Sequence, residues 1–382
     1  MSHALLSASG AARWLACPPS AKLEQKYPDS TSEYAREGSL AHEFCELKVS
    51  HKFLGKSVSV AIPELKKHEL YQPEMDGYTD QYLDFVSKVY MSFDSDPFLA
   101  VEKHLDFSQW VPGGFGTGDC IIIGGSDLHI IDFKYGKGVA VSPENNPQMM
   151  LYALGAYEAY GLLYPVKTIS MSIVQPRIDN IETSEIDIAD LLSWAENTVR
   201  PTAQLAIEGK GNFAAGDHCR FCRAKGACRQ RAAFNMDIEP ATKKDPAILA
   251  PDEIGEYLTR SADVVAWAND LKEYALSQCL DGVKIPGWKA VEGRSLRAWT
   301  DEDKAFEYAH KELKIPNTKL YVKKPVTVAA LEKAIGKDKF KDMESYVVKP
   351  AGKPALAAEK DKRPAITNKP TAKEAFAESE EK

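Results

Sequence analysis

Residues 116–138 read GTGDCIIIGGSDLHIIDFKYGKG and carry the most informative pattern in the chain. Two runs rich in isoleucine flank a Gly-Gly-Ser-Asp turn, which predicts a β-hairpin. The first strand begins near Asp119 and the second ends near Asp132 and Lys134, so the hairpin brings the two carboxylates together. Because side chains alternate along a strand, Asp132 and Lys134 share one face and Phe133 points to the other.

These charges have the chemistry of a divalent-cation site. The carboxylates of Asp119 and Asp132 are hard oxygen ligands, and the backbone carbonyl of Phe133 could complete the shell of Mg²⁺ or Mn²⁺. A metal held in this way activates water for phosphodiester hydrolysis, and Lys134 orients that water or neutralises developing charge. The alternative is an exposed hairpin end with an ordinary salt bridge, and this pattern alone leaves both interpretations open.

The composition is typical of a soluble protein with room for two domains. The chain has 382 residues, of which 27% are charged and 44% are apolar. Because no apolar run could span a bilayer and no signal-peptide pattern begins the chain, we expect a cytoplasmic location without membrane contact. The net charge of −7 would repel a polyanion, so binding to nucleic acid would depend on local basic patches or metal ions.

The spacing of apolar residues predicts an α/β fold. Besides the hairpin, strand-like runs cover residues 98–107 and 166–174, and helical spacing covers 33–53, 74–93, about 145–160 and 187–208. This order of elements predicts a core in which helices flank both faces of a small mixed sheet.

Composition shifts predict a division of the chain into four regions. They are a first domain over 1–235, a linker over 236–251, a C-terminal α+β accessory domain over 252–349 and a tail over 350–382. The linker is polar and contains proline, and the accessory domain opens with a long helical pattern. The tail is rich in Lys, Pro, Ala and Glu with few aromatics, so we expect it to be disordered.

Four further residues are candidates for the same site. His42 lies on a predicted helix, where it is either a metal ligand or an ordinary core or surface histidine. Glu102 lies on the strand before the hairpin and is either a further ligand or an exposed charge. Gln148 and Tyr152 are four residues apart on a helix, so both project from one face and could contact a DNA backbone or orient a catalytic group.

The cysteines form a second candidate metal site. Cys219, Cys222 and Cys228 are spaced too closely for ordinary core packing, and Cys17 is a natural fourth thiolate beside a proline-stopped turn. Four thiolates suit an iron–sulfur cluster or zinc. The alternative is a local zinc knuckle in which His218 is the fourth ligand. The remaining cysteines are expected to be small buried residues: Cys45, Cys120 and Cys279.

Taken in order, these motifs resemble the PD-(D/E)XK nuclease superfamily, in its RecB-like branch. The matching motifs are Gly38-x3-His42, Gly116-x2-Asp119, Asp132-x-Lys134 and Gln148-x3-Tyr152. One early cysteine and three late ones are similar to the four-cysteine iron–sulfur staple of several such nucleases. The resemblance covers about residues 5–232 and extends to phage and prophage proteins.

The resemblance implies a restriction-endonuclease-like core with a C-terminal helical or mixed extension. It implies a metal held by His42, Asp119 and Asp132, a catalytic Lys134, and Gln148 and Tyr152 in the same cleft. It also implies a [4Fe–4S] cluster, with Zn²⁺ as the alternative. Asp132 stands where many relatives carry Glu, a difference that the superfamily tolerates.

The leading hypothesis is therefore a Mg²⁺- or Mn²⁺-dependent DNA exonuclease that processes DNA ends in phage-type recombination or replication. Its partners would be DNA and a phage single-strand annealing or single-strand binding protein. One alternative is a structure-specific endonuclease. Others are a non-catalytic DNA-binding or structural protein on a nuclease scaffold, and a redox or sensor protein built around the cysteines.

Overall fold

The computed structural model describes residues 4–28, 33–237, 250–291 and 301–321, with short pieces at 328, 331, 336–341 and 346–347. By its contacts the chain divides into two units, Met1–Val291 and Glu292–Lys382. The first unit contains every candidate site residue.

A five-stranded mixed sheet forms the centre of the first unit, in the order β1-β2-β3-β4-β5. Its strands are β1 (Phe98–Asp106), β2 (Phe115–Gly124), β3 (Asp127–Phe133), β4 (Thr168–Gln175) and β5 (Asn180–Asp187). Only β3 and β4 are parallel among these five strands, and the other neighbours are antiparallel. The predicted hairpin is β2–β3, which closes at the pair Gly124–Asp127. Gly125 in its turn has φ +58°, a conformation that glycine adopts without steric cost.

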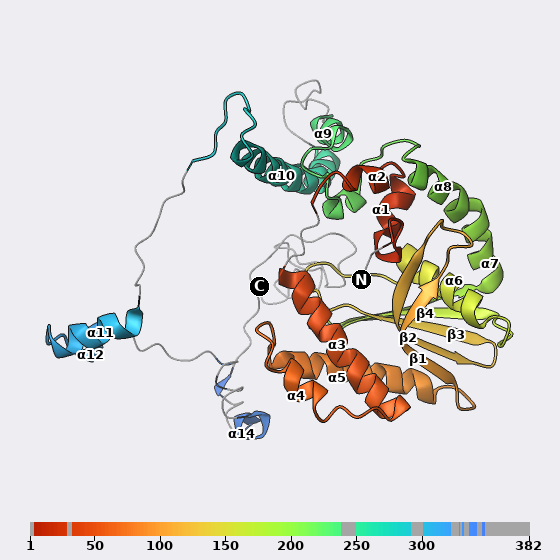
Figure 1. Cartoon of the computed structure of the whole chain (residues 1–382), viewed down its shortest axis with the longest axis horizontal. Helices are drawn as coiled ribbons and strands as arrows, with labels where there is room; N and C mark the ends of the chain where they lie inside the picture. The colour runs from red at the N-terminus through yellow and green to blue at the C-terminus, as the bar shows by residue number, and fades with distance from the viewer. Residues whose placement is uncertain are drawn as a thin grey trace, which may run out of the picture. The chain divides into compact units, whose positions relative to one another are not determined.

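Helices cover both faces of this sheet, as predicted (Figure 1). One face carries α3 (Glu33–Leu54), α4 (Ala61–Leu65) and α5 (Glu74–Met91). The other carries the N-terminal helices and the helices that follow the hairpin. These are η1 (Ala8–Gly10), α1 (Ala11–Ala16), α2 (Ser20–Glu24), α6 (Pro147–Tyr160), α7 (Ile188–Trp194), the π-turn η3 (Ala195–Val199) and α8 (Arg200–Glu208). A short turn, η2 (Pro176–Ile178), connects β4 to β5.

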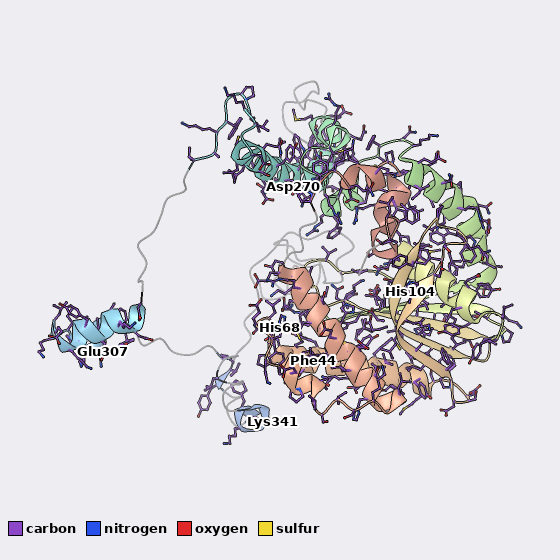
Figure 2. The ribbon with its side chains drawn as sticks, in the orientation of Figure 1. Phe44, His68, His104, Asp270, Glu307 and Lys341 are labelled. Atoms are coloured by element: carbon purple, nitrogen blue, oxygen red, sulfur yellow. The ribbon has the colours of Figure 1, made fainter. Side chains whose placement is uncertain are left out.

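Side-chain alternation along β2 divides the interior into two cores. Ile121 and Ile123 pack toward α6, whereas Cys120 and Ile122 pack toward α3 and α5. Phe44, on α3, is fully buried in this second core and is labelled in Figure 2. The isoleucine runs thus form strands that are buried on both faces, which explains their continuous apolar sequence.

The last part of the first unit differs from the predicted domain boundary. After η4 (Asp217–Phe221) and α9 (Arg229–Met236), the long helix α10 (Pro251–Leu280) belongs to the same unit rather than to a separate domain. The buried Arg231 explains this, because its guanidinium pairs with Asp263 at 3.2 Å and Asp270 at 2.6 Å on α10. A buried cation needs such partners, so α10 is tied to α9.

The second unit has short described helices. These are α11 (Glu302–Lys311), α12 (Asn317–Leu320) and α14 (Lys337–Lys341). The rings of Phe306 and Tyr321 meet edge to face at 5.2 Å between centroids. The predicted tail over 350–382 and most of the predicted linker lie outside the described residues. No helix in the described ranges is long and apolar enough to cross a membrane.

Candidate active site

A distortion in β1 positions the first acidic residue. Glu102 has φ +48° and lies opposite Asp119 in a ladder that is otherwise paired on both sides. Leu99 and Leu105 are six residues apart, so a regular strand would place both side chains on the same face of the sheet. Instead Leu99 packs in the core beneath α3 and α5, and Leu105 packs in the core beneath α6. The alternation of side chains between the two faces of β1 is therefore shifted by one residue at Glu102. A left-handed non-glycine residue costs about 1–3 kcal/mol and is typical of functional sites.

Asp119 is held at the centre of the site by two donors. Its Oδ2 accepts a hydrogen bond from the Phe133 backbone N–H at 2.7 Å and lies 3.3 Å from Nδ1 of His42. Ligand atoms of His42, Glu102 and Asp119 all lie within 4.8 Å of one another. Three side chains from α3, β1 and β2 thus converge on one point.

A second polar group adjoins this triad at the ends of β3 and α6. Lys134 Nζ lies 2.9 Å from Asp132 Oδ2 and donates to Gln148 Oε1 at 3.2 Å. The Gln148 amide in turn donates to Asp132 Oδ1 at 3.4 Å and to the Tyr152 hydroxyl at 3.1 Å. The predicted pairing of Asp132 with Lys134, and of Gln148 with Tyr152, is present in this network.

The triad and its neighbours shift one another's proton affinities. Burial lowers the pKa of His42, but the Asp119 carboxylate outweighs burial and raises the pKa to about 9. Burial, reinforced by the charge of Asp119, raises the pKa of Glu102 to about 7. Burial also acts to raise the pKa of Asp119, yet His42 and Lys134 bring it below its usual value.

The pKa values of the partly buried Asp119 and the buried Asp132 are shifted in opposite directions. Burial, together with the negative charge of Asp119, raises the pKa of Asp132 despite the opposing Lys134. Burial lowers the pKa of Lys134, but Asp132 outweighs it and the net pKa is raised. Carboxylates crowded in this way repel one another, and a bound cation would relieve the repulsion.

The donor chemistry fits a hard divalent cation, although the grouping differs from the predicted set. The close triad consists of His42, Glu102 and Asp119, whereas Asp132 faces Lys134 and Gln148. Glu102 is therefore as well placed to bind a metal as His42 and Asp119 are. Two carboxylates and one imidazole suit Mg²⁺ or Mn²⁺ with water completing the shell. A ligand role for the Phe133 carbonyl stays a prediction.

The side chain of Gln175 holds the loop that follows Lys134, and the sequence analysis did not single this residue out. Gln175, buried at the end of β4, donates to the carbonyls of Gly136 at 2.6 Å and Val139 at 2.9 Å. Its Oε1 accepts from the Val141 N–H and from the Asn180 amide, both at 3.1 Å. All four hydrogen-bonding positions of this amide are used, so the loop is fixed beside the site. A polar residue at the carboxyl end of a buried parallel strand was the available signal.

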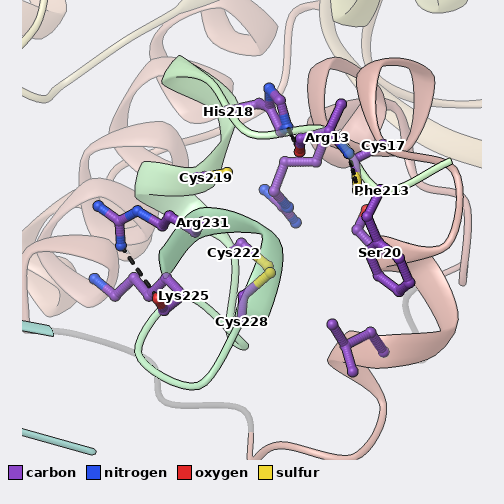
Figure 3. Close-up of a pocket in the computed structure, with 12 residues that line it drawn as sticks. Arg13, Cys17, Ser20, Phe213, His218, Cys219, Cys222, Lys225, Cys228 and Arg231 are labelled. Atoms are coloured by element: carbon purple, nitrogen blue, oxygen red, sulfur yellow. Dashed lines mark hydrogen bonds between the residues drawn. The ribbon is translucent and has the colours of Figure 1, made fainter. Parts of the chain in front are cut away.

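The four predicted cysteines line one cavity at a second place in the first unit. Cys17, Cys219, Cys222 and Cys228 line a cavity of about 20 Å³, with Cys17 coming from the end of α1 (Figure 3). Cys17 Sγ accepts a hydrogen bond from Ala214 N at 3.5 Å, across 197 residues of sequence. Burial raises the pKa of Cys222 to about 12. Four thiols around one cavity fit the donor set of an iron–sulfur cluster or of zinc.

His218 lines the same cavity and lies next to Cys17. Its Nε2 lies 3.0 Å from the Ala214 carbonyl, and a hydrogen bond with Cys17 raises the pKa of its ring. Cys45 and Cys120 are buried against α3 and α5, as predicted. Cys279 lies on α10 and is only partly buried, so the prediction that it is buried is wrong.

Glu24 joins the same chain segments without any metal. Its carboxylate lies 3.2 Å from Nε of Arg13 and accepts the Arg223 backbone N–H at 2.8 Å. The N-terminal helices are thus fixed to the cysteine loop by both a charged side chain and the thiols.

Fold and site together define an α/β protein in which a five-stranded mixed sheet lies between helices. Acidic side chains from β1 and β2 meet a histidine from α3, beside the lysine that follows β3. A model of the family described as "Protein of unknown function (DUF2800)" matches residues 3–364, and the chain belongs to this family. Among solved structures, the chain is similar to one described as "Crystal structure of SSO0001". The two share 16% identity, over 56% of this chain and 95% of that one, with a TM-score of 0.25. A similarity this weak carries no argument about fold or function.

Proposed function

We propose that this protein is a Mg²⁺- or Mn²⁺-dependent DNA nuclease of the PD-(D/E)XK type. The observation that carries the proposal is the convergence of His42, Glu102 and Asp119 within 4.8 Å, beside a lysine paired with a buried carboxylate. Strongly shifted pKa values and strained backbone residues both cluster at functional sites.

Each residue has a distinct role in this proposal. His42, Glu102 and Asp119 would hold the metal, which supplies a polarised phosphate and an activated water when bound. Asp132 would hold Lys134 in place and adjoin the metal, and the ammonium group would stabilise charge on the phosphate. Gln148 connects Asp132, Lys134 and Tyr152 through its amide, so it would set the direction of the lysine.

The cysteine site would be structural in this proposal. A [4Fe–4S] cluster, or zinc, would join Cys17 to the loop of Cys219, Cys222 and Cys228. It would fix the N-terminal helices to the end of the sheet domain. The biological setting that fits an end-processing nuclease is phage-type recombination or replication, with a single-strand annealing or binding protein as partner.

The test is cleavage of end-labelled linear DNA and of circular DNA, each with Mg²⁺, Mn²⁺ or EDTA. Linear DNA should be degraded only with metal, and circular DNA should be cut much more slowly. Equal rates on both substrates would favour a structure-specific endonuclease. Absence of cleavage, with DNA binding retained, would favour a non-catalytic protein. Anaerobic protein that carries iron and sulfide but neither cuts nor binds DNA would favour a redox or sensor role.

A further inference from the structure

The outward face of the β1–β2 ribbon continues beyond the candidate active site. In this ribbon Leu105 pairs with Gly116, and both face α6. A Cβ built on Gly116 would lie 2.7 Å from the Tyr152 ring, which shows how closely the ribbon crosses that helix. The neighbouring residues His104 and Phe115 must therefore face away from α6.

His104 and Phe115 form a stacked ring pair on this outward face. Their ring centroids are 5.1 Å apart with an interplanar angle of 26°. His104, labelled in Figure 2, is exposed, and Phe115 is partly exposed. A pair of rings already stacked on a rigid ribbon offers an apolar surface with little conformational freedom left to lose.

The ring pair lies on the same side of the ribbon as the candidate metal site. His42 reaches Asp119 from α3, on the side opposite α6, so Asp119, Thr117 and Phe115 follow one another along one face of β2. At about 3.3 Å per residue, Phe115 lies about 13 Å along the strand from Asp119. Lys103 alternates with His104 and lies on the other face, whereas Asp106, which pairs with Phe115, shares the outward face.

We propose that the His104–Phe115 pair is a stacking platform for an unpaired base of a DNA strand. Its placement next to the metal site rests on the proposed nuclease function, and it narrows the substrate to single-stranded or frayed DNA ends. Base–aromatic stacking is tolerant of sequence because every base has a π-face. Bases inside an intact duplex are stacked on each other and cannot occupy the platform.

The experiment measures binding rather than cleavage. A fluorescein-labelled single-stranded oligonucleotide of mixed sequence and the matching blunt duplex are titrated in EDTA at low salt, with fluorescence anisotropy as readout. Removing the ring in Phe115→Leu or His104→Ala should weaken single-strand binding about 5- to 100-fold and duplex binding less than twofold. Phe115→Trp keeps a ring and should retain wild-type affinity.

Phe98 gives a matched control, because it is a partly exposed aromatic at the far end of β1 that contacts Tyr160. Phe98→Leu should leave single-strand affinity unchanged. Unaltered single-strand affinity in Phe115→Leu and His104→Ala, with cleavage by the wild type intact, would overturn the platform and leave the nuclease standing. Weakened binding in these variants, with no cleavage by the wild type under any metal, would support the platform and refute the nuclease.

Discussion

The carboxylate site and the cysteine site are built in opposite ways. Asp119 is oriented by a backbone amide of the neighbouring strand, and Lys134 by a network drawn from one strand and one helix. The cysteines join chain segments 197 residues apart, with a weak N–H···S hydrogen bond between them. The sheet supports the carboxylate site, whereas the proposed metal cluster at the cysteines would itself support the fold. Changes at the two sites should therefore differ in kind.

The largest effect is expected at the carboxylate site. Asp119→Asn keeps an oxygen for the Phe133 N–H but removes the charge, so cleavage should fall by at least about 100-fold while the melting temperature changes little. Rates on end-labelled DNA and a thermal melt measure the two quantities. Asp127→Asn, at the exposed turn end of β3, is the control and should be neutral. Near-normal cleavage by Asp119→Asn would remove this residue from the site.

The cysteine site should respond in stability. Replacing any of Cys17, Cys219, Cys222 and Cys228 by Ala should release the bound metal and cost about 3–5 kcal/mol on the chain-entropy account of a cross-link. Iron, sulfide and zinc analysis and denaturant unfolding measure both effects.

Cys279→Ala is the control for this series, because Cys279 lies on α10 outside the cavity. Its metal content should stay at the wild-type level. If Cys17→Ala instead keeps one equivalent of zinc, the ligands are local and His218 is among them. The cysteine site would then not link the N-terminal helices to the rest of the fold, and the contrast drawn between the two sites would be wrong.

Metal affinity at the carboxylate site should depend strongly on pH. His42 must lose a proton to bind metal, and its pKa is about 9. Affinity for Mn²⁺ should therefore fall as the pH drops below 9, by about 50-fold in all from pH 9 to pH 7, and more steeply below pH 7 as Glu102 also takes up a proton. Calorimetric titration at several pH values measures this slope. His42→Gln should flatten it above pH 7, and a flat wild-type profile would contradict a ligand role for His42.

The smallest effect should come from removing the charge of Glu24, whose contacts with Arg13 and Arg223 need no metal. Glu24→Gln weakens the contact with Arg13 and the hydrogen bond from the Arg223 amide, and should cost about 1–2 kcal/mol of unfolding free energy. The exposed pair of Glu64 with Lys67 is the comparison, and Glu64→Gln should cost less than Glu24→Gln. Equal losses would mean that Glu24 adds no more than a surface ion pair.

Much of the sheet was predictable because its central strands are continuous apolar runs with a glycine turn between them. Strand β5 was missed because Asn180–Asp187 is an edge strand of largely polar residues, in which only alternate positions are shielded. The conformation of Glu102 could not be predicted either, since no local sequence signal requires a left-handed residue in mid-strand. That conformation places the Glu102 carboxylate beside His42 and Asp119.

The contact between α9 and α10 could not be predicted for a related reason. The partners of Arg231 are acidic residues more than thirty positions later on α10, and nothing in a local window connects them.

The pairing of Arg231 with α10 has a consequence for cleavage of the backbone itself. Lys225 also reaches Asp270, at 2.9 Å, and Asn235 donates to Asp263 at 2.9 Å, so several charged contacts cross from the cysteine loop to α10. A protease cut between Asp237 and Ala250 would sever the peptide chain and leave these contacts in place. The two resulting polypeptides should copurify as a non-covalent complex, and the gene split at this point should yield a protein that assembles from its halves.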